Sequence, residues 1–155
     1  MSTSNIRVTD LQPLSSPRSF IDSQPITPEI AKIVTEARSA IEDIEQGRDG
    51  RMVMLVGPCS IHDEKSGLEY AKQLAVIAEE VKDKILVVMR VYFEKPRTTV
   101  GWKGLINDPN LDGTFDMQDG LTRARAFLLE VLKLGLPAGT EFLDPFTPQY
   151  LADLI

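Results

Sequence analysis

Short apolar runs alternate with helical stretches along most of the chain, and this alternation limits the folds that the sequence can adopt. Residues 52–56 and 85–91 are nearly continuous apolar runs of strand length. From about Glu64 and again from about Gly120, apolar residues recur every three or four positions, which predicts amphipathic helices. Strands that are apolar on both faces and are joined by helices form buried parallel sheets. The pattern predicts an α/β protein and leaves a doubly wound sheet and a (β/α)8 barrel both open.

Two Thr-Pro pairs mark further helix starts, because threonine is a good N-cap and proline fits the first helical position. Thr27-Pro28 precedes a long apolar stripe, and Thr147-Pro148 precedes a helix near the last residue. A weaker strand is predicted for residues 138–143. The predicted order is a helix followed by βα units, with a long segment of no clear periodicity after the second strand.

The first residues have a different composition, rich in Ser, Pro, Asp and Gln. We interpret residues 1–26 as an irregular arm, with at most one short strand around Ile6 and Val8. The predicted organisation is this arm, a preceding helix within 27–50, and the βα units within 51–155.

Composition excludes several classes of protein. The chain has 17 Lys and Arg against 23 Asp and Glu, a net charge of −6, which argues against a general nucleic-acid binder. No apolar run approaches the ~20 residues of a membrane span, and the N-terminus lacks the apolar core of a secretory signal. A single cysteine excludes an internal disulfide. We therefore expect a cytoplasmic protein without a nucleic-acid or membrane partner.

The ends of the predicted strands carry polar residues. The first strand is followed by residues 57–63, the second ends at Arg90 and is followed by residues 92–104, and the third carries Glu141 and Asp144. In both candidate architectures, ligands bind at the carboxyl ends of the strands. We expect these residues to lie along one rim.

Arg90 is unusual because it lies near the end of an otherwise apolar strand, where an unpaired charge is costly. Its partner is either Glu94 or Glu141, or an anionic ligand. The segment from Arg90 to Lys103 carries +3 in a chain of −6, which leaves −9 for the other residues. The charged residues of this segment are Arg90, Glu94, Lys95, Arg97 and Lys103. Such a loop suits a phosphate ester or carboxylate, while its interleaved aromatic residues leave RNA stacking as a weaker alternative.

Cys59 follows the first predicted strand and lies close in sequence to His62 and Asp63. A lone cysteine is most often a small buried hydrophobe, but this position makes it a candidate metal ligand or nucleophile. No CxxC or HxxxH spacing supports a metal site. Asp63 fits equally well as the N-cap of the following helix.

Three strings are recognisable together: Gly-Pro-Cys-Ser-Ile-His-Asp at 57–63, the 21 residues at 89–109, and Thr-Pro-Gln-Tyr at 147–150. They closely resemble the class I 3-deoxy-D-arabino-heptulosonate 7-phosphate (DAHP) synthases. The resemblance extends from about Thr27 to Ile155.

The resemblance implies a (β/α)8 barrel, of which this chain is expected to form the N-terminal portion, with an arm, a helix and about three βα units. It implies an aldol-like condensation of phosphoenolpyruvate with erythrose 4-phosphate, which releases phosphate and begins the shikimate pathway to the aromatic amino acids. A divalent metal such as Mn, Fe or Co, feedback inhibition by an aromatic amino acid and a homo-oligomer are implied as well. The alternatives are a non-catalytic product that keeps only substrate-loop or subunit-contact surfaces, and a synthase for another phosphorylated aldose.

The resemblance also implies roles for individual residues. Cys59 is expected to bind the metal, Arg90 and Lys95 to contact phosphoenolpyruvate, and Glu141 to lie near both metal and substrate as a third catalytic residue. The clamp for erythrose 4-phosphate is expected to be Lys95, Pro96, Arg97 and Thr98. Part of the allosteric pocket is expected to be formed by Asp144, Pro148 and Gln149.

Overall fold

A three-stranded parallel sheet organises the computed structural model, which describes residues 3–4, 6, 8 and 11–155. The strands β1 (Met52–Val56), β2 (Ile85–Arg90) and β3 (Ala138–Gly139) lie side by side in the order β1-β2-β3. β1 and β2 pair along their length, whereas β3 pairs only with the last two residues of β2. The predicted α/β class and parallel sheet are confirmed.

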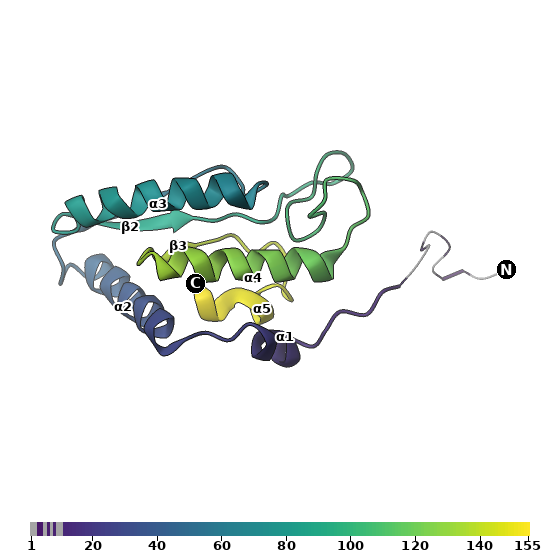
Figure 1. Cartoon of the computed structure of the whole chain (residues 1–155), viewed down its shortest axis with the longest axis horizontal. Coiled ribbons are helices and arrows are strands. Elements are labelled where there is room, and N and C mark those ends of the chain that lie inside the picture. The colour runs from purple at the N-terminus through teal and green to yellow at the C-terminus, as the bar shows by residue number, and fades with distance from the viewer. Residues whose placement is uncertain (1–2, 5, 7, 9–10) are drawn as a thin grey trace.

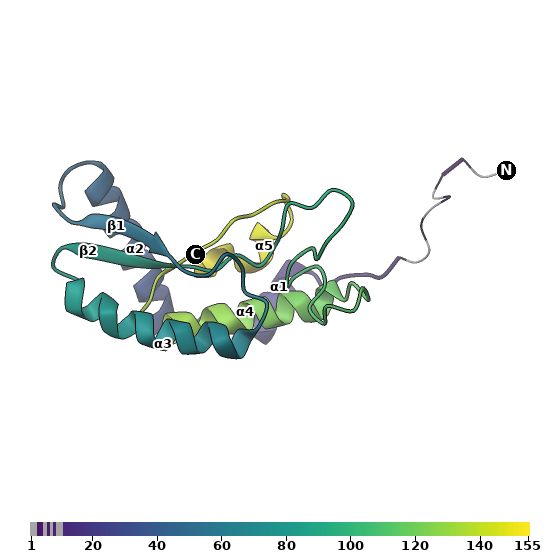
Figure 2. The ribbon, with the colours of Figure 1, turned by 90° about the horizontal axis from the view of Figure 1, so that it is seen from above.

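Two long helices cover one side of this sheet. α3 (Glu64–Val81) follows β1, α4 (Met117–Lys133) precedes β3, and Figures 1 and 2 show both helices along the same side of the strands. The core lies between them and the sheet and contains, among others, Ala71, Leu74, Val87, Met89, Leu128 and Leu132. Within the described part of the chain, no helix is both long and apolar enough to span a bilayer.

The helix α2 (Pro28–Glu45) begins at the predicted Thr-Pro pair. The Thr27 side chain accepts a hydrogen bond from the Ile30 N–H at 3.3 Å, which satisfies one of the free donors of the first turn. Ile30 and Val34 are buried, and α2 packs against α4 and the C-terminal 3₁₀ turn Ala152–Leu154.

The arm contains a helix that the sequence analysis did not predict. α1 (Pro17–Ser23) starts with Ser16 as N-cap and Pro17 in the first turn, and it buries Phe20 edge-on against Tyr150 at 5.3 Å between ring centroids. The interpretation of residues 1–26 as irregular is wrong there. The strand suggested around Ile6 and Val8 lies partly outside the described residues.

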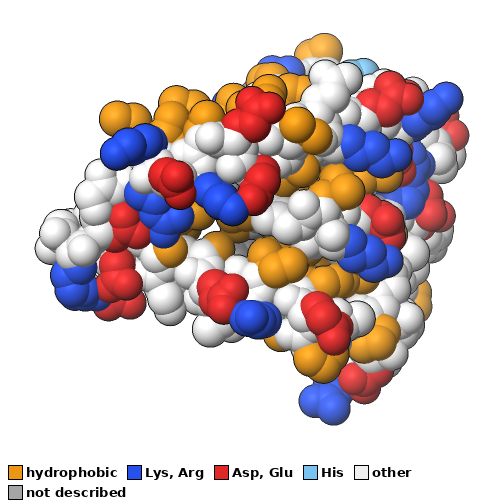
Figure 3. Space-filling model, turned by 60° about the vertical axis from the view of Figure 1, so that its left-hand side comes forward, with side chains coloured by type: hydrophobic (Ala, Val, Ile, Leu, Met, Phe, Trp, Pro, Cys, Tyr) orange, Lys and Arg blue, Asp and Glu red, His pale blue; other side chains and the backbone are white. Residues whose placement is uncertain are grey.

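The expectation of a buried first strand is also wrong for this chain. Met52, Met54 and Leu55 are exposed, although β1 is as apolar as predicted. Within the described residues β1 pairs with β2 alone, so its other edge and much of both faces remain accessible. The space-filling view shows hydrophobic side chains among charged ones on the left-hand side of the molecule (Figure 3).

Other boundaries differ because tertiary contacts fix them. α4 starts at Met117 rather than about Gly120, since Asp116 caps it by accepting from the Asp119 N–H at 3.0 Å. β3 has two residues instead of the six predicted at 138–143. Thr147 does not cap α5 (Pro148–Leu151) with its side chain, because its hydroxyl donates to Asp144 instead, at 2.6 Å.

A fully buried arginine on α4 joins three segments. Arg125 donates two hydrogen bonds to the Asp153 carboxylate at 2.7 and 2.8 Å, one to the Gln24 carbonyl at 2.8 Å and one to the Tyr150 carbonyl at 2.9 Å. These contacts hold the α1–α2 connection and the C-terminal turns against α4. Removing the arginine is costly because the Asp153 carboxylate, 30% exposed, and both carbonyls then lose their donor.

We expect Arg125→Met to lower the free energy of unfolding by about 3 kcal/mol, because it leaves the partly buried Asp153 carboxylate and the Gln24 and Tyr150 carbonyls without this donor. Urea denaturation followed by circular dichroism measures this. Arg18→Met is the matched control, since Arg18 pairs with Asp22 on the exposed surface of α1 and its loss should cost under about 1 kcal/mol. Equal losses in the two variants would contradict the role of Arg125.

Candidate functional site

The strands β1 and β2 approach each other closely at their carboxyl ends. A Cβ atom at Gly57 would lie 2.6 Å from the Arg90 carbonyl oxygen, so only glycine fits there. Just beyond, the Ile61 N–H donates to the Tyr92 carbonyl at 2.9 Å. The segment that carries Cys59 therefore lies against the segment that carries Arg90, as expected for strand ends at one rim.

Lys95 reaches across this junction to Cys59. Its Nζ donates to the Cys59 Sγ at 2.9 Å and to the Cys59 carbonyl at 3.1 Å, while Arg90 Nη2 donates to the same carbonyl at 3.3 Å. The pKa of the Cys59 thiol is lowered by the hydrogen bond and the positive charge of Lys95, and by the charges of Arg90 and Arg97, against the smaller effect of burial. This shift increases the share of the thiolate, which is the nucleophilic and metal-binding form of cysteine.

Arg90 has no carboxylate partner among the described residues. Its guanidinium lies over the Tyr92 ring, 4.1 Å from the centroid, and its Nε is buried without a hydrogen-bond partner, the one such side-chain atom in the described part of the chain. The alternative in which Glu94 or Glu141 neutralises Arg90 is therefore wrong. A buried unsatisfied charged donor is costly unless a ligand completes it.

The segment 92–107, here called the cationic loop, is folded back on itself. The Lys95 N–H donates to the Lys103 carbonyl at 3.0 Å, and Lys103 Nζ donates to the Arg97 carbonyl at 3.0 Å. Gly104 allows the return, since its φ is +106° and a Cβ there would lie 2.2 Å from the Phe93 carbonyl oxygen.

The outer part of the cationic loop is open to solvent. Pro96, Arg97 and Thr98 are all exposed, and Trp102 anchors the inner part by donating from Nε1 to the Asp108 carbonyl at 2.7 Å. The loop thus presents a guanidinium and a hydroxyl outwards beside Lys95. This arrangement can bind a phosphate through charge and hydrogen bonds together.

Three predicted residues do not join this cluster. Glu141 is exposed and makes no hydrogen bond or ion pair with the described residues. His62 is exposed, and Asp63 accepts a hydrogen bond from the Ser66 N–H at 2.7 Å. The interpretation of Asp63 as the N-cap of α3 is thereby confirmed.

The donor set does not by itself form a metal centre. In the portion of the chain that the structure describes, no three His, Cys, Asp or Glu side chains are placed to hold one ion. Cys59 offers a single sulfur ligand, which is fewer donors than divalent metals take from proteins. The geometry is that of an anion site with a reactive thiol beside it.

A cavity of about 260 Å3, here called the groove, lies beside the turn that follows β3. Asp144 reaches its wall and accepts hydrogen bonds from the Phe146 N–H at 2.6 Å and from the Thr147 N–H at 2.8 Å. Of the predicted allosteric residues, Asp144 lines this groove, whereas Pro148 and Gln149 lie next to it on α5 without lining it. The other residues of its wall are Leu14, Met117, Leu121, Phe146, Thr147 and Tyr150.

The sequence analysis did not find the apolar wall of this groove, which comes from the arm, α4 and α5 together. Phe146, close in sequence to Asp144, was the local signal that could have indicated an apolar site there. The apolar residues that the arm and α4 contribute give no such signal, because nothing in the sequence distinguishes them from ordinary core residues.

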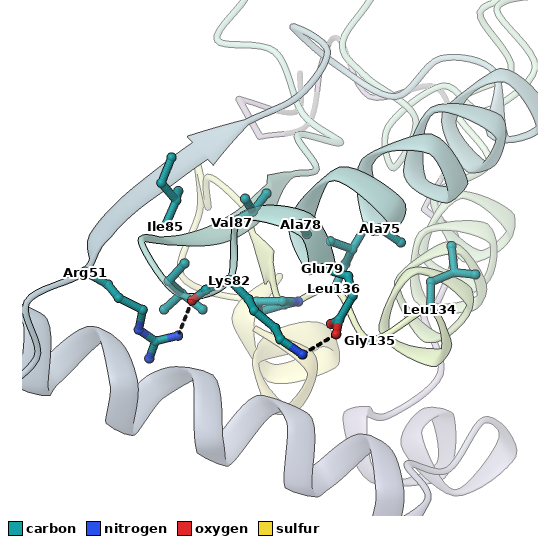
Figure 4. Close-up of a pocket in the computed structure, with 12 residues that line it drawn as sticks. Arg51, Ala75, Ala78, Glu79, Lys82, Ile85, Val87, Leu134, Gly135 and Leu136 are labelled. Carbon is teal, nitrogen blue, oxygen red and sulfur yellow. Dashed lines mark hydrogen bonds and ion pairs between the residues drawn. The ribbon is translucent and has the colours of Figure 1, made fainter.

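Another cavity, of about 190 Å3, lies at the opposite end of the strands, near the first residue of β2 and the residue before β3 (Figure 4). Arg51 donates to the Lys82 carbonyl at 3.4 Å, and Lys82 pairs with Glu79. Its charged groups already have partners, and no predicted site residue lies in it. It is not a candidate for the anion site.

Comparison with known proteins identifies the family. Residues 25–155 match the profile of the DAHP synthetase I family. The chain belongs to the DAHP synthetase I family. Among its relatives, a phospho-2-dehydro-3-deoxyheptonate aldolase from Amycolatopsis methanolica is 52% identical over 151 residues, which are 97% of this chain and 74% of that protein.

Longer members of the DAHP synthetase I family match equally well. The Tyr-sensitive phospho-2-dehydro-3-deoxyheptonate aldolase of Escherichia coli is 51% identical over 97% of this chain and 42% of its own length. A solved structure of the Francisella tularensis phospho-2-dehydro-3-deoxyheptonate aldolase superposes with a TM-score of 0.92 and 44% identity, covering 96% of this chain and 43% of that one. The chain thus spans about two fifths of the length of such relatives. Other relatives are named Phe-sensitive and Trp-sensitive.

We expect Lys95→Met to slow alkylation of Cys59 by iodoacetamide at pH 7, because losing the ammonium raises the thiol pKa towards its ordinary value. Each unit of increase lowers the thiolate fraction about tenfold. Cys59 is the only cysteine, so mass spectrometry of the labelled chain follows this site alone. Lys65→Met on the exposed surface of α3 is the control, and an equal rate in both variants would contradict the contact.

Proposed function

We propose that this chain carries the anion-binding part of a class I DAHP synthase, an enzyme that condenses phosphoenolpyruvate with erythrose 4-phosphate and releases phosphate. The observation that supports this most is the Arg90 guanidinium, which has no carboxylate partner and an unpaired Nε among the described residues and lies next to Lys95 where β1 and β2 end. Membership of the DAHP synthetase I family supports the reaction class.

In the proposed reaction, this chain's residues bind and orient two anionic substrates. Arg90 and Lys95 hold the phosphate and carboxylate of phosphoenolpyruvate, and Lys95, Pro96, Arg97 and Thr98 receive the phosphate of erythrose 4-phosphate. C3 of phosphoenolpyruvate attacks the aldehyde carbon, water adds at C2, and the hemiketal phosphate collapses to a ketone with loss of phosphate. The cations contribute by positioning and by neutralising charge that would otherwise separate the substrates.

Two further roles extend the proposal. Glu141, which is exposed and follows β3 by two residues, is the proposed third catalytic residue, because β3 ends beside Arg90. Cys59 is the ligand that this chain offers to a divalent metal of the Mn, Fe or Co type. Because no group of three such donors is placed to hold one ion in the described residues, we expect the chain alone to bind such ions weakly.

The fold proposed for the whole protein is a (β/α)8 barrel, with β1, β2 and β3 as its first strands. The strands follow one another in sequence order and both α3 and α4 lie on one side, whereas a doubly wound sheet reverses its order and carries helices on both faces. On this proposal residues 1–26 are the arm, 27–50 the preceding helix, and 51–155 the first part of the barrel of a cytoplasmic homo-oligomer.

The groove beside Asp144 is the proposed site for an aromatic amino acid that inhibits the reaction. Its wall is mostly apolar and includes the rings of Phe146 and Tyr150, which suit an aromatic side chain. The Asp144 carboxylate provides an anionic group for the amino acid's ammonium. Pro148 and Gln149 are proposed to support the groove from α5.

We expect the chain to bind phosphoenolpyruvate, and Arg90→Ala to weaken this binding by about 10- to 100-fold, because hydrogen bonds to charged groups contribute about 1.5–3 kcal/mol. Isothermal titration calorimetry at low salt measures it. Arg48→Ala is the control, since Arg48 pairs with Asp43 at the far end of α2. Unchanged affinity in Arg90→Ala would refute the assigned contact, and absence of binding by the unmodified chain would refute the anion site.

We expect Phe146→Ser to weaken binding of free L-phenylalanine several-fold, because it removes an aromatic wall of the groove. Phe146 is 69% exposed, so folding should not suffer. Val100→Ser, at a residue 82% exposed in the cationic loop, is the matched control. Calorimetric titration of both variants tests the groove, and equal affinities would place the amino acid elsewhere.

A further inference from the structure

The segment that follows the cationic loop is held by an arginine of α4 that lies outside the anion site. Arg123 Nη1 donates to the Pro109 carbonyl at 3.0 Å and to Asn110 Oδ1 at 3.3 Å. Its Nη2 donates to one oxygen of the Glu64 carboxylate at 2.8 Å, and its Nε donates to the other oxygen. One guanidinium therefore joins α4, the first residue of α3 and the end of the cationic loop.

The hydrogen bonds of the loop connect this anchor to Lys95. Pro109 follows Asp108, whose carbonyl accepts a hydrogen bond from the Trp102 indole N–H at 2.7 Å. Lys103, the residue after Trp102, accepts a hydrogen bond from the Lys95 N–H at 3.0 Å. A shift of the Pro109 carbonyl is thus transmitted to the backbone of Lys95.

The contact with Glu64 fixes the direction of the arginine. Glu64 is the first residue of α3 and directly follows the segment 57–63, which carries Cys59. Two N–H donors of one guanidinium on the two oxygens of one carboxylate form a fork that holds both groups in a single orientation. The hydrogen bond from Arg123 lowers the pKa of Glu64, so the pair stays ionised at neutral pH.

The position of Arg123 on α4 favours a role in the loop over a role in global stability. Phe127 lies four residues later on the same face of the helix and packs edge-on against Phe93 in the cationic loop, at 6.0 Å between ring centroids. α4 thus supports both the start and the end of the loop. The side chains of Arg123 and Glu64 are 29% and 28% exposed, and ion pairs in contact with water add less to stability than buried ones.

We infer that Arg123 is a positioning residue for the anion site, which holds the end of the cationic loop on α4 and thereby keeps Lys95 in place. Glu64 orients Arg123 for this contact. Without Arg123 the Pro109 carbonyl loses its donor on α4, and small displacements of binding groups are costly for a ligand held by several of them. The effect on phosphoenolpyruvate rests on the proposed function, whereas the effect on the loop does not.

Trp102, the only tryptophan of the chain, reports the state of the loop by fluorescence. We expect Arg123→Met to raise the acrylamide quenching constant of its emission about twofold or more, because the loop opens more often once its anchor is lost. Acrylamide is neutral and is not attracted by the cations of the loop. A quenching constant equal to that of the unmodified chain would overturn the inference.

Arg51→Met is the matched control. Arg51 forms an ion pair with Asp49 at a similar side-chain exposure, 28% and 24%, but it precedes β1 at the opposite end of the strands. We expect this variant to leave the quenching constant unchanged. An equal increase in both variants would show a general loosening of the fold and would also overturn the inference.

Binding of phosphoenolpyruvate measures the consequence for the anion site. We expect Arg123→Met to weaken it about 3- to 10-fold in calorimetric titration, comparable to the loss of one hydrogen bond, and Arg51→Met to leave it unchanged. Unchanged affinity in Arg123→Met would overturn the positioning role. If the unmodified chain does not bind phosphoenolpyruvate, the proposed anion site fails, and the quenching experiment still decides whether Arg123 holds the loop.

Glu64→Gln tests the route through the arginine. It should raise quenching and weaken phosphoenolpyruvate binding by smaller factors than Arg123→Met does, because Arg123 remains but loses the carboxylate that orients it. Added to Arg123→Met it should have no further effect, as expected for two residues that act as a unit, and additive losses would overturn the route. If Arg123→Met does not fold, the milder Glu64→Gln decides, and a quenching constant equal to that of the unmodified chain would overturn the inference.

Discussion

Where β1 and β2 end, the backbone at Gly57 passes so close to Arg90 that a methyl group would not fit between them. Parallel pairing brings both strands to this point in the same direction, and the hydrogen bond from Ile61 to Tyr92 continues the contact past the strands. As a result, the Cys59 thiol meets the Lys95 ammonium. The lowered pKa of the thiol follows from its contact with Lys95, and the unpaired Nε of Arg90 lies at the same junction.

Two adjacent residues of the cationic loop, one acidic and one basic, contact different neighbours. Lys95 connects the loop to the end of β1, whereas Glu94 connects it to the turn after β3, so the loop is held between its two neighbours in the sheet. Arg125 supports this arrangement from α4. It holds the C-terminal turns in place, and these turns follow the turn that contains Asp144. The candidate anion site of this chain is therefore supported from three strand ends.

The elements that could be predicted from sequence are those set by local pattern. The strands at 52–56 and 85–90 and the helix caps at Thr27 and Asp63 match their predictions closely, because apolar periodicity and cap chemistry act within a few residues. The arm shows where prediction from local pattern fails. Ser16-Pro17 repeats the signature that identified α2, but α1 is stabilised mainly by burying Phe20 against Tyr150, a contact across most of the chain. Glu94 was a reasonable partner for Arg90 by sequence distance, yet the turn after β3 decides where its carboxyl points.

The order of the strands has a consequence for how the molecule forms during synthesis. Since β1, β2 and β3 pair in the order in which they are made, each strand leaves the ribosome after the strand with which it pairs. Cys59, Arg90 and Lys95 are all available once β2 and the start of the cationic loop have emerged. The turn with Asp144 is made later, after the whole cationic loop. The order of translation is thus also the order in which the parts of the site become available.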